Sequence, residues 1–188
     1  MIRYSIICCV GSIFFLVGCQ SKSSHAVKDT SKEVLLETIQ RYETILENDY
    51  KSLMENSLKE IPSDHLTQLS EAYISFYDAF HKDTLTPYYL DKLHQLYLQD
   101  KRYTYSVAWA DTLISNYPSY KGKANVLISA ASTTDMFLND TTKVKRFYLQ
   151  LLKDYPKLNN ELKKFVDNRL DNLSMNYLEW IKVNQDNS

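Results

Sequence analysis

The sequence predicts an all-α fold, a short right-handed solenoid of about seven antiparallel helices, and three observations support this prediction. Glycine, which weakens helices, is almost absent, and Gly122 is the only glycine after Gly18. A pattern of two amphipathic helices recurs along the chain, and the distance from Ala72 to Ser106 and from Ser106 to Val144 is typical of the repeat length in helical solenoids. All four prolines fall between the apolar stripes, where a helix can begin or end.

The repeat is clearest ahead of two Tyr-Pro pairs, Tyr117-Pro118 and Tyr155-Pro156. Apolar or small residues stand at matching places before each proline, and an earlier set stands one repeat upstream. These sets are Ala72, Phe76 and Ala79; Ser106, Ala110 and Leu113; and Val144, Tyr148 and Leu151. The intervening segments repeat as Leu90, Leu93, His94 and Tyr97; Ala124, Leu127, Ile128 and Ala131; and Leu162, Phe165, Val166 and Arg169. We expect these positions to form the core, and four extra residues to lie near Thr134–Leu138.

Caps and prolines predict where each helix begins and ends. Thr30 with Glu33 forms a capping box for the first helix, and Ser63 is the expected cap of the second. The expected helices run from Thr30 to Pro62, from Ser63, from Thr86, from about Tyr103, and over residues 121–137, 141–155 and 159–183. The last is too long for one repeat, so we expect it to cover the open end of the solenoid.

Residues 1–18 have the features of a signal peptide. Arg3 precedes the mainly apolar run Ile6–Val17, which is too short to span a bilayer as a stable helix. The run ends in Leu-Val-Gly-Cys, which resembles the lipobox of bacterial lipoproteins. The resemblance implies cleavage after Gly18 and acylation of Cys19, whose acyl chains would hold the protein on a lipid bilayer. The alternative is an uncleaved N-terminal anchor with a coincidental cysteine.

Residues 19–30 predict a lipidated cysteine followed by a flexible tether. The stretch after Cys19 is polar, contains three serines and shows no helical periodicity. It also lacks the acidic cluster that sends some bacterial lipoproteins to the cell surface. We therefore expect a cell-envelope protein that is lipid-anchored in the outer membrane and faces the periplasm.

The segment from Pro87 to Pro118 resembles a tetratricopeptide repeat (TPR). Leu93 and Tyr97 stand where the first helix of the repeat has its Leu and Tyr, whereas His94 replaces a small residue. The Tyr-Pro endings resemble the variant repeats of bacterial envelope lipoproteins that help to assemble the outer membrane. The resemblance implies that residues 31–188 form a TPR-like domain with a C-terminal capping helix.

Composition and motifs argue against several kinds of chemistry. The net charge of −1 gives no basic excess for nucleic acid, and the sequence after Cys19 contains no further cysteine. The four histidines show no zinc-binding spacing. The sequence has no glycine-rich phosphate loop and no pair of carboxylates whose spacing suggests acid–base catalysis. We therefore expect no metal, no cofactor and no enzymatic activity, and we expect His94 to be a packed, hydrogen-bonded residue.

In the family that the repeats resemble, the first helix of each pair lines a concave groove. Carried onto this chain, the groove positions include Tyr88, Asp91, Gln95, Asn125, Ser129, Lys163 and Asp167. This row lacks the Lys-and-Asn cluster with which some family members bind a C-terminal carboxylate. The alternative is that these residues are ordinary solvated helix positions.

Two functional hypotheses follow. The first is a non-catalytic scaffold or adaptor that binds another envelope protein through its helical surface, within an outer-membrane assembly or cell-wall complex. The second is a small-ligand-binding or enzyme-accessory lipoprotein with a pocket between helices. Four tyrosines lie outside the clear apolar stripes and could serve either function. We favour core or rim packing over peptide binding for these residues, which are Tyr88, Tyr89, Tyr105 and Tyr120.

Overall fold

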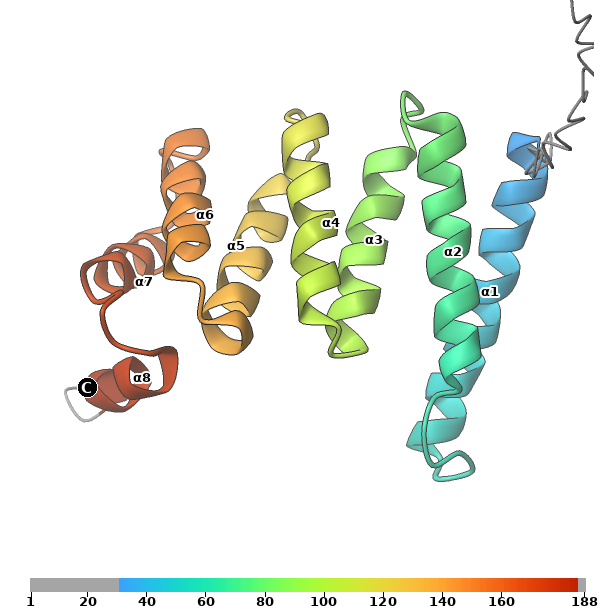
Figure 1. Cartoon of the computed structure of the whole chain (residues 1–188), viewed down its shortest axis with the longest axis horizontal. Helices are drawn as coiled ribbons and strands as arrows, with labels where there is room; N and C mark the ends of the chain where they lie inside the picture. Colours follow the sequence, from blue (N-terminus) through green and yellow to red (C-terminus); the bar gives the residue numbers. More distant parts are fainter. Residues whose placement is uncertain (1–30, 186–188) are drawn as a thin grey trace, which may run out of the picture. The chain divides into compact units, whose positions relative to one another are not determined.

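The computed structural model describes residues 31–185, and this part of the chain is helical and contains no β-strand (Figure 1). It holds eight α-helices and one π-helical turn, so the prediction of about seven helices is one short. They are α1 (Lys32–Met54), α2 (Ser63–Phe80), α3 (Thr86–Gln99), α4 (Tyr103–Asn116), α5 (Lys123–Thr133), η1 (Thr134–Leu138), α6 (Thr141–Asp154), α7 (Asn160–Asp171) and α8 (Tyr177–Gln185). No helix within residues 31–185 is both long and apolar enough to cross a membrane.

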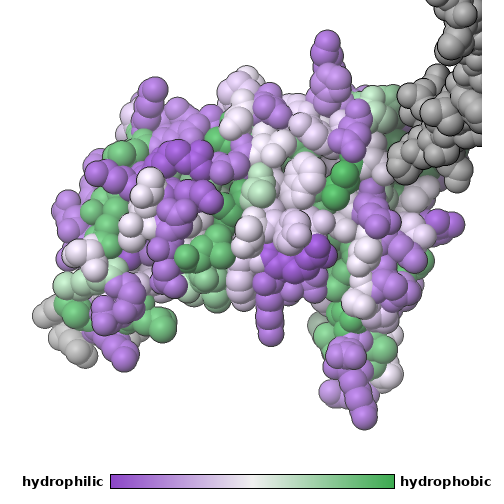
Figure 2. Space-filling model, viewed as in Figure 1, coloured by the Kyte–Doolittle hydropathy of each residue, from purple (hydrophilic) through white to green (hydrophobic). Residues whose placement is uncertain are grey.

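Neighbours in the sequence are also neighbours in space. Consecutive helices from α1 to α7 pack against one another, and α8 packs against η1. Figure 1 shows α1 to α6 standing side by side in chain order. On the face seen in Figure 2, hydrophilic residues alternate with small apolar areas, so no single apolar patch dominates that face.

The core lies between neighbouring helices and follows the repeat positions. Phe76 and Tyr148 are both 0% exposed, as their shared repeat position predicts. Ala79 is exposed, and its predicted place in the core is wrong. The apolar stripe of α2 continues through Phe80 instead, whose ring centre lies 5.4 Å from that of Phe76, because residues four apart share one helix face.

The two Tyr-Pro endings leave their helices in the same way. Tyr117, at the end of α4, has φ −130° and ψ 65°, and Tyr155, at the end of α6, has φ −128° and ψ 69°. The Tyr117 amide donates to the Leu113 carbonyl at 2.9 Å, and the Tyr155 amide donates to the Leu151 carbonyl at 3.0 Å. The proline that follows cannot continue a helix, so each sequence pair sets the same exit geometry.

The first helix differs from its prediction at both ends. Ser31 caps α1 by accepting a hydrogen bond from the Val34 amide, and the predicted cap Thr30 lies outside the described residues. The helix ends at Met54 rather than at Pro62, because Asn56 adopts a left-handed conformation with φ 58°. Ser63 is the first residue of α2 and makes no side-chain cap, which also corrects the prediction.

The predicted helix over residues 159–183 is two helices, and the single long helix is wrong. α7 ends at Asp171 with Asn172 as its C-cap, and the Asn176 side chain accepts a hydrogen bond from the Glu179 amide at 3.0 Å, which caps α8. Asn side chains compete for backbone groups and favour caps over helix interiors. The spacing of Asn176 and Glu179 is the sequence signal for this second helix start.

The four extra residues that the sequence predicts near Thr134–Leu138 coincide with η1. The chain runs from α5 directly into this π-helical turn, which ends at Asn139 in the left-handed conformation with φ 53°. The Asp140 side chain then caps α6 by accepting a hydrogen bond from the Lys143 amide at 3.0 Å. A π-turn adds residues to a helical segment without ending it, so the extra residues are accommodated between α5 and α6.

Candidate binding cleft

A cleft of about 620 Å³ lies among α1, α2, α3 and α5, and we call it the tyrosine–carboxylate cleft. It is lined by Glu43, Leu46, Glu47, Tyr50, Leu69, Tyr73, Tyr88, Asp91, Lys92, Gln95, Leu96, Gln99 and Asn125. Four of the seven predicted groove residues are among them, namely Tyr88, Asp91, Gln95 and Asn125. The structure thus brings part of the predicted row together on one surface.

The other three predicted residues lie elsewhere in the described part of the chain. Ser129 is one turn beyond Asn125 on α5 and hydrogen-bonds to His94. Lys163 and Asp167 lie on α7 and form an ion pair with each other at 2.6 Å. The predicted row is therefore divided between a cleft, a buried network and a surface ion pair.

Helical periodicity on α3 explains why its groove residues face the cleft. Leu90, Leu93 and Tyr97 are buried on one side of this helix. Asp91 and Gln95 are four residues apart, so they share another face of the helix. The core residues thus fix the orientation of α3, and that orientation presents its polar residues to the cleft.

Tyr73 and Tyr88 line one side of the cleft, and Tyr89, which is not itself a lining residue, packs against both rings; we call these three residues the tyrosine wall. The ring centres of Tyr73 and Tyr89 lie 5.5 Å apart with the planes inclined by 25°, and Tyr88 and Tyr89 are also 5.5 Å apart. Tyr89 in turn meets the buried Phe76 edge-on at 4.9 Å, which anchors the wall to the core. Tyr88 remains 46% exposed and Tyr89 is half-buried, so the rim-packing interpretation describes Tyr89 better than Tyr88.

Glu43 is the centre of the polar contacts. One of its oxygens accepts a hydrogen bond from the Tyr73 hydroxyl at 2.6 Å and forms an ion pair with Lys92 Nζ at 2.9 Å. Burial and the hydrogen bond to Glu43 raise the pKa of Tyr73 well above its usual range, so its hydroxyl stays protonated. Burial alone would lower the pKa of Lys92, but its hydrogen bonds to Glu43 and Tyr88 leave that pKa raised.

Asp91 is held by the loop that precedes α5. The Tyr120 hydroxyl donates to Asp91 Oδ2 at 2.9 Å, and burial together with Asp91 raises the pKa of Tyr120. This position of the Tyr120 ring requires Gly122, because a Cβ there would lie 2.6 Å from Tyr120 Cε1. Gly122, the only glycine after Gly18, therefore has a local role, because it leaves room for the tyrosine that orients Asp91.

The first helix also contributes to the cleft, which the repeat pattern did not predict. Glu43, Glu47 and Tyr50 of α1 line the cleft, although α1 lies outside the recognised repeat. Tyr50 donates to Gln99 Oε1 at 2.8 Å, which joins α1 to the end of α3. The spacing of the two glutamates, four residues apart beside the apolar stripe of this helix, was the available signal.

His94 is a buried, hydrogen-bonded residue, as predicted. Its Nδ1 lies 2.8 Å from Ser106 Oγ, and its Nε2 lies 2.9 Å from Ser129 Oγ. Burial lowers the pKa of His94, which favours the neutral ring. The contact with Ser129 has the length of a nucleophile–base pair, but Ser129 lies inside α5, where backbone amides are engaged in the helix and cannot stabilise an oxyanion. The network ties α3 to α4 and α5.

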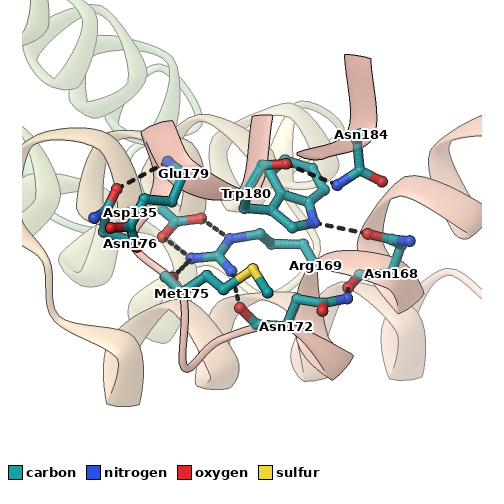
Figure 3. Close-up of polar contacts among 9 residues, drawn as sticks. All are labelled: Asp135, Asn168, Arg169, Asn172, Met175, Asn176, Glu179, Trp180 and Asn184. Atoms are coloured by element: carbon teal, nitrogen blue, oxygen red, sulfur yellow. Dashed lines mark hydrogen bonds and ion pairs between the residues drawn. The ribbon is translucent and has the colours of Figure 1, made fainter. Parts of the chain in front are cut away.

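A second polar cluster closes the C-terminal end (Figure 3). Arg169 of α7 is 0% exposed and makes two contacts with Asp135 of η1, at 2.6 and 2.8 Å. Its guanidinium also donates to the carbonyls of Asn172 and Met175, at 2.5 and 2.9 Å, in the turn between α7 and α8. These contacts join α7 to η1 and to the turn that precedes α8. Across residues 31–185, no group of histidine and carboxylate side chains is arranged to hold a metal.

Comparison with known proteins leaves the tyrosine–carboxylate cleft as the main guide to function. No protein-family model matches the sequence, and no curated protein matches it.

Proposed function

We propose that this protein is a lipid-anchored adaptor of the bacterial cell envelope, held at the outer membrane by acylated Cys19 and facing the periplasm. In this proposal, residues 31–188 form a short TPR-like solenoid that binds a segment of another envelope protein, as one part of an outer-membrane assembly or cell-wall complex.

The matching helix exits support the TPR-like part of the proposal. Tyr117 and Tyr155 share φ and ψ to within a few degrees and make the same amide hydrogen bond. The residues at matching repeat positions in α4 and α6, the helices that precede these exits, are buried in both. Equal exits after equally spaced core residues are what stacked helix pairs require.

One observation carries the binding part of the proposal. Residues that the repeat register predicts for the groove, including Tyr88, Asp91 and Gln95, meet α1 and α2 at the tyrosine–carboxylate cleft. Tyrosine supplies a large contact area at low entropic cost, and such side chains are enriched where proteins bind proteins. The cleft combines these rings with half-exposed polar groups, as a peptide-binding surface needs.

Site-specific photo-crosslinking in native membranes tests the binding face. A photoreactive amino acid at Gln95 or Asn125, inside the cleft, should give one stoichiometric protein adduct in mass spectrometry. The same amino acid at Lys145, which is exposed on α6, is the matched control and should give none. An adduct from position 145 alone would place the binding face on the second helices and contradict the proposal.

The size of the cleft also favours a second candidate function. A volume of about 620 Å³ is within the range of small-molecule sites, so a ligand-binding or enzyme-accessory lipoprotein fits the same residues. Native mass spectrometry of protein purified from membranes separates the two. A bound small molecule without a crosslinked protein would favour the second candidate.

The anchor has its own test. Cys19→Ala should abolish incorporation of labelled palmitate and leave the precursor uncleaved. Labelling of the Cys19→Ala protein at the wild-type level would refute the lipoprotein assignment.

A further inference from the structure

We infer that the tyrosine–carboxylate cleft binds the cationic side chain of a Lys or Arg residue in an extended segment of the partner protein. This inference rests on the proposed adaptor function and specifies the chemistry of the partner.

Charge is the first reason. Among the described residues that line the cleft, Glu43, Glu47 and Asp91 are acidic and Lys92 is basic, so the lining carries a net charge of −2 (three carboxylates against one ammonium). The chain as a whole is close to neutral, with a formal net charge of −1. The negative charge is therefore concentrated at this surface, and it would attract a cation and repel a terminal carboxylate.

Hydrogen-bond donors orient the carboxylates of the cleft, and each carboxylate can still accept further hydrogen bonds. Tyr73 and Lys92 both contact Oε1 of Glu43, and Tyr120 contacts Oδ2 of Asp91. Each carboxylate has two oxygens and about four lone-pair sites, so one or two donors hold its direction without saturating it. Glu47 pairs with Lys51 at 2.9 Å on an exposed helix face, a contact weak enough to exchange for a ligand cation.

Lys92 shows how a cation is held at this surface. Its Nζ lies 2.9 Å from Glu43 Oε1 and 5.2 Å from the centre of the Tyr88 ring. A carboxylate beside an aromatic face is the combination that binds ammonium and guanidinium groups. Lys92 therefore occupies part of the site as an internal competitor.

The apolar lining distinguishes a side chain from an inorganic cation. Leu46, Leu69 and Leu96 lie among the charged and aromatic residues of the cleft. Long basic side chains place their methylene stems along apolar surface and their charge at a polar rim. A metal ion or a free ammonium ion would gain nothing from these leucines.

Peptide binding to the full-length protein in detergent micelles tests the inference by fluorescence anisotropy. The probes are fluorescein-labelled Gly-Ser peptides of equal length that carry two lysines, two arginines, two norleucines or two glutamates. We expect the lysine and arginine peptides to bind with a Kd at least about tenfold lower than the norleucine peptide, which keeps the stem without the charge. Equal binding of lysine and norleucine peptides would overturn the inference.

Three variants locate the site. Glu47→Gln with Asp91→Asn keeps the hydrogen-bond acceptors and should weaken lysine-peptide binding about tenfold. Glu71→Gln is the matched control, because Glu71 is exposed on α2, about 200° around the helix from Leu69 and Tyr73. Lys92→Met removes the internal competitor and should raise affinity for the lysine peptide, by up to about fivefold. Unfolding cannot produce that gain, and unchanged or weaker binding by Lys92→Met would contradict the inference.

The crosslink at Gln95 separates this inference from the adaptor proposal. A protein adduct at Gln95 that persists in the Glu47→Gln, Asp91→Asn protein would refute cation recognition and leave the adaptor proposal standing. Normal lysine-peptide binding without any protein adduct would support the cation site and refute the adaptor proposal.

Discussion

The two ends of the helical domain use the same chemical pair, a carboxylate and a cation, in opposite ways. At the tyrosine–carboxylate cleft, the side chains of Lys92 and Glu43 are 37% and 32% exposed, and their contact at 2.9 Å is open to water. At the C-terminal end, Arg169 and Asp135 are 0% and 3% exposed and their contact is 2.6 Å (Figure 3). A partly solvated pair can exchange partners, whereas a buried pair must stay together, because either charge alone would be left desolvated. The first arrangement suits binding and the second suits folding.

Removing one member of the buried pair tests this contrast most directly. Asp135→Ala would leave the guanidinium of Arg169 buried with the Asn172 and Met175 carbonyls as its remaining acceptors. We expect a loss of about 3–5 kcal/mol in the free energy of unfolding, measured by urea denaturation.

A double variant controls for the lost packing at Asp135. Asp135→Ala with Arg169→Met removes both charges and should recover much of the stability, since no unpaired charge remains buried. If the single variant lost less than about 1 kcal/mol, the Asp135–Arg169 pair would behave as a surface pair and the contrast between the two ends would fail.

A second prediction concerns the support behind the cleft. Phe76 is 0% exposed and meets Tyr89, so it belongs to the core and also holds the tyrosine wall. Phe76→Ala should cost about 3–5 kcal/mol in urea unfolding, because it leaves a cavity between α2 and its neighbours. Tyr105→Ala, at a residue that is 55% exposed, is the control and should cost far less. An unchanged urea midpoint for Phe76→Ala would contradict the repeat register that places Phe76 in the core.

The sequence allowed the core to be predicted because burial follows helical periodicity. Phe76 and Tyr148 share a repeat position, and both are fully buried. Part of the cleft was predictable for the same reason, since Asp91 and Gln95 fall between the buried positions of α3. The place of Glu43 and Tyr50 in the cleft was not, because their spacing marks only a helix face and the tertiary packing of α1 against α2 brings that face to the cleft.

The buried ion pair could not be predicted from periodicity. Arg169 occupies the repeat position of Tyr97 and Ala131, so its burial follows from the register, but its partner does not. Asp135 belongs to η1, the inserted turn, which has no counterpart in the segment that ends at Tyr117-Pro118. Pairing two side chains so far apart in the sequence requires knowledge of where the inserted turn lies in three dimensions.

Low pH should lower the free energy of unfolding through His94, whose side chain joins α3 to α4 and α5. Burial lowers the pKa of His94 in the folded protein, so the unfolded chain binds the proton more readily. The stability that neutral His94 contributes is fully present above its pKa in the unfolded chain, about 6.5. It is lost as the pH falls below that pKa, by at most about 1.4 kcal/mol per pH unit.

His65 must be separated from His94 in that experiment. The hydrogen bond to Asp49 raises the pKa of His65, so its contribution is present below pH of about 6.5 and is lost as the pH rises through the folded value. The measurement is the urea midpoint between pH of about 7.5 and about 5.5 in a His65→Ala background, with and without His94→Gln. Identical pH slopes in the two proteins would exclude His94 as the group responsible.

The smallest expected effect completes the contrast between solvated and buried pairs. Lys163 and Asp167 lie four residues apart on α7 at 2.6 Å, and their side chains are 52% and 46% exposed. Because water solvates both charges in the folded and unfolded chains, Asp167→Ala should change the free energy of unfolding by no more than about 0.5 kcal/mol. The same change should leave the crosslink at Gln95 intact, since neither residue lines the described cleft. Loss of the crosslink with normal stability would extend the binding surface from α3 along the predicted row to α7, and the solvated pair would then belong to the partner site rather than to the ordinary surface.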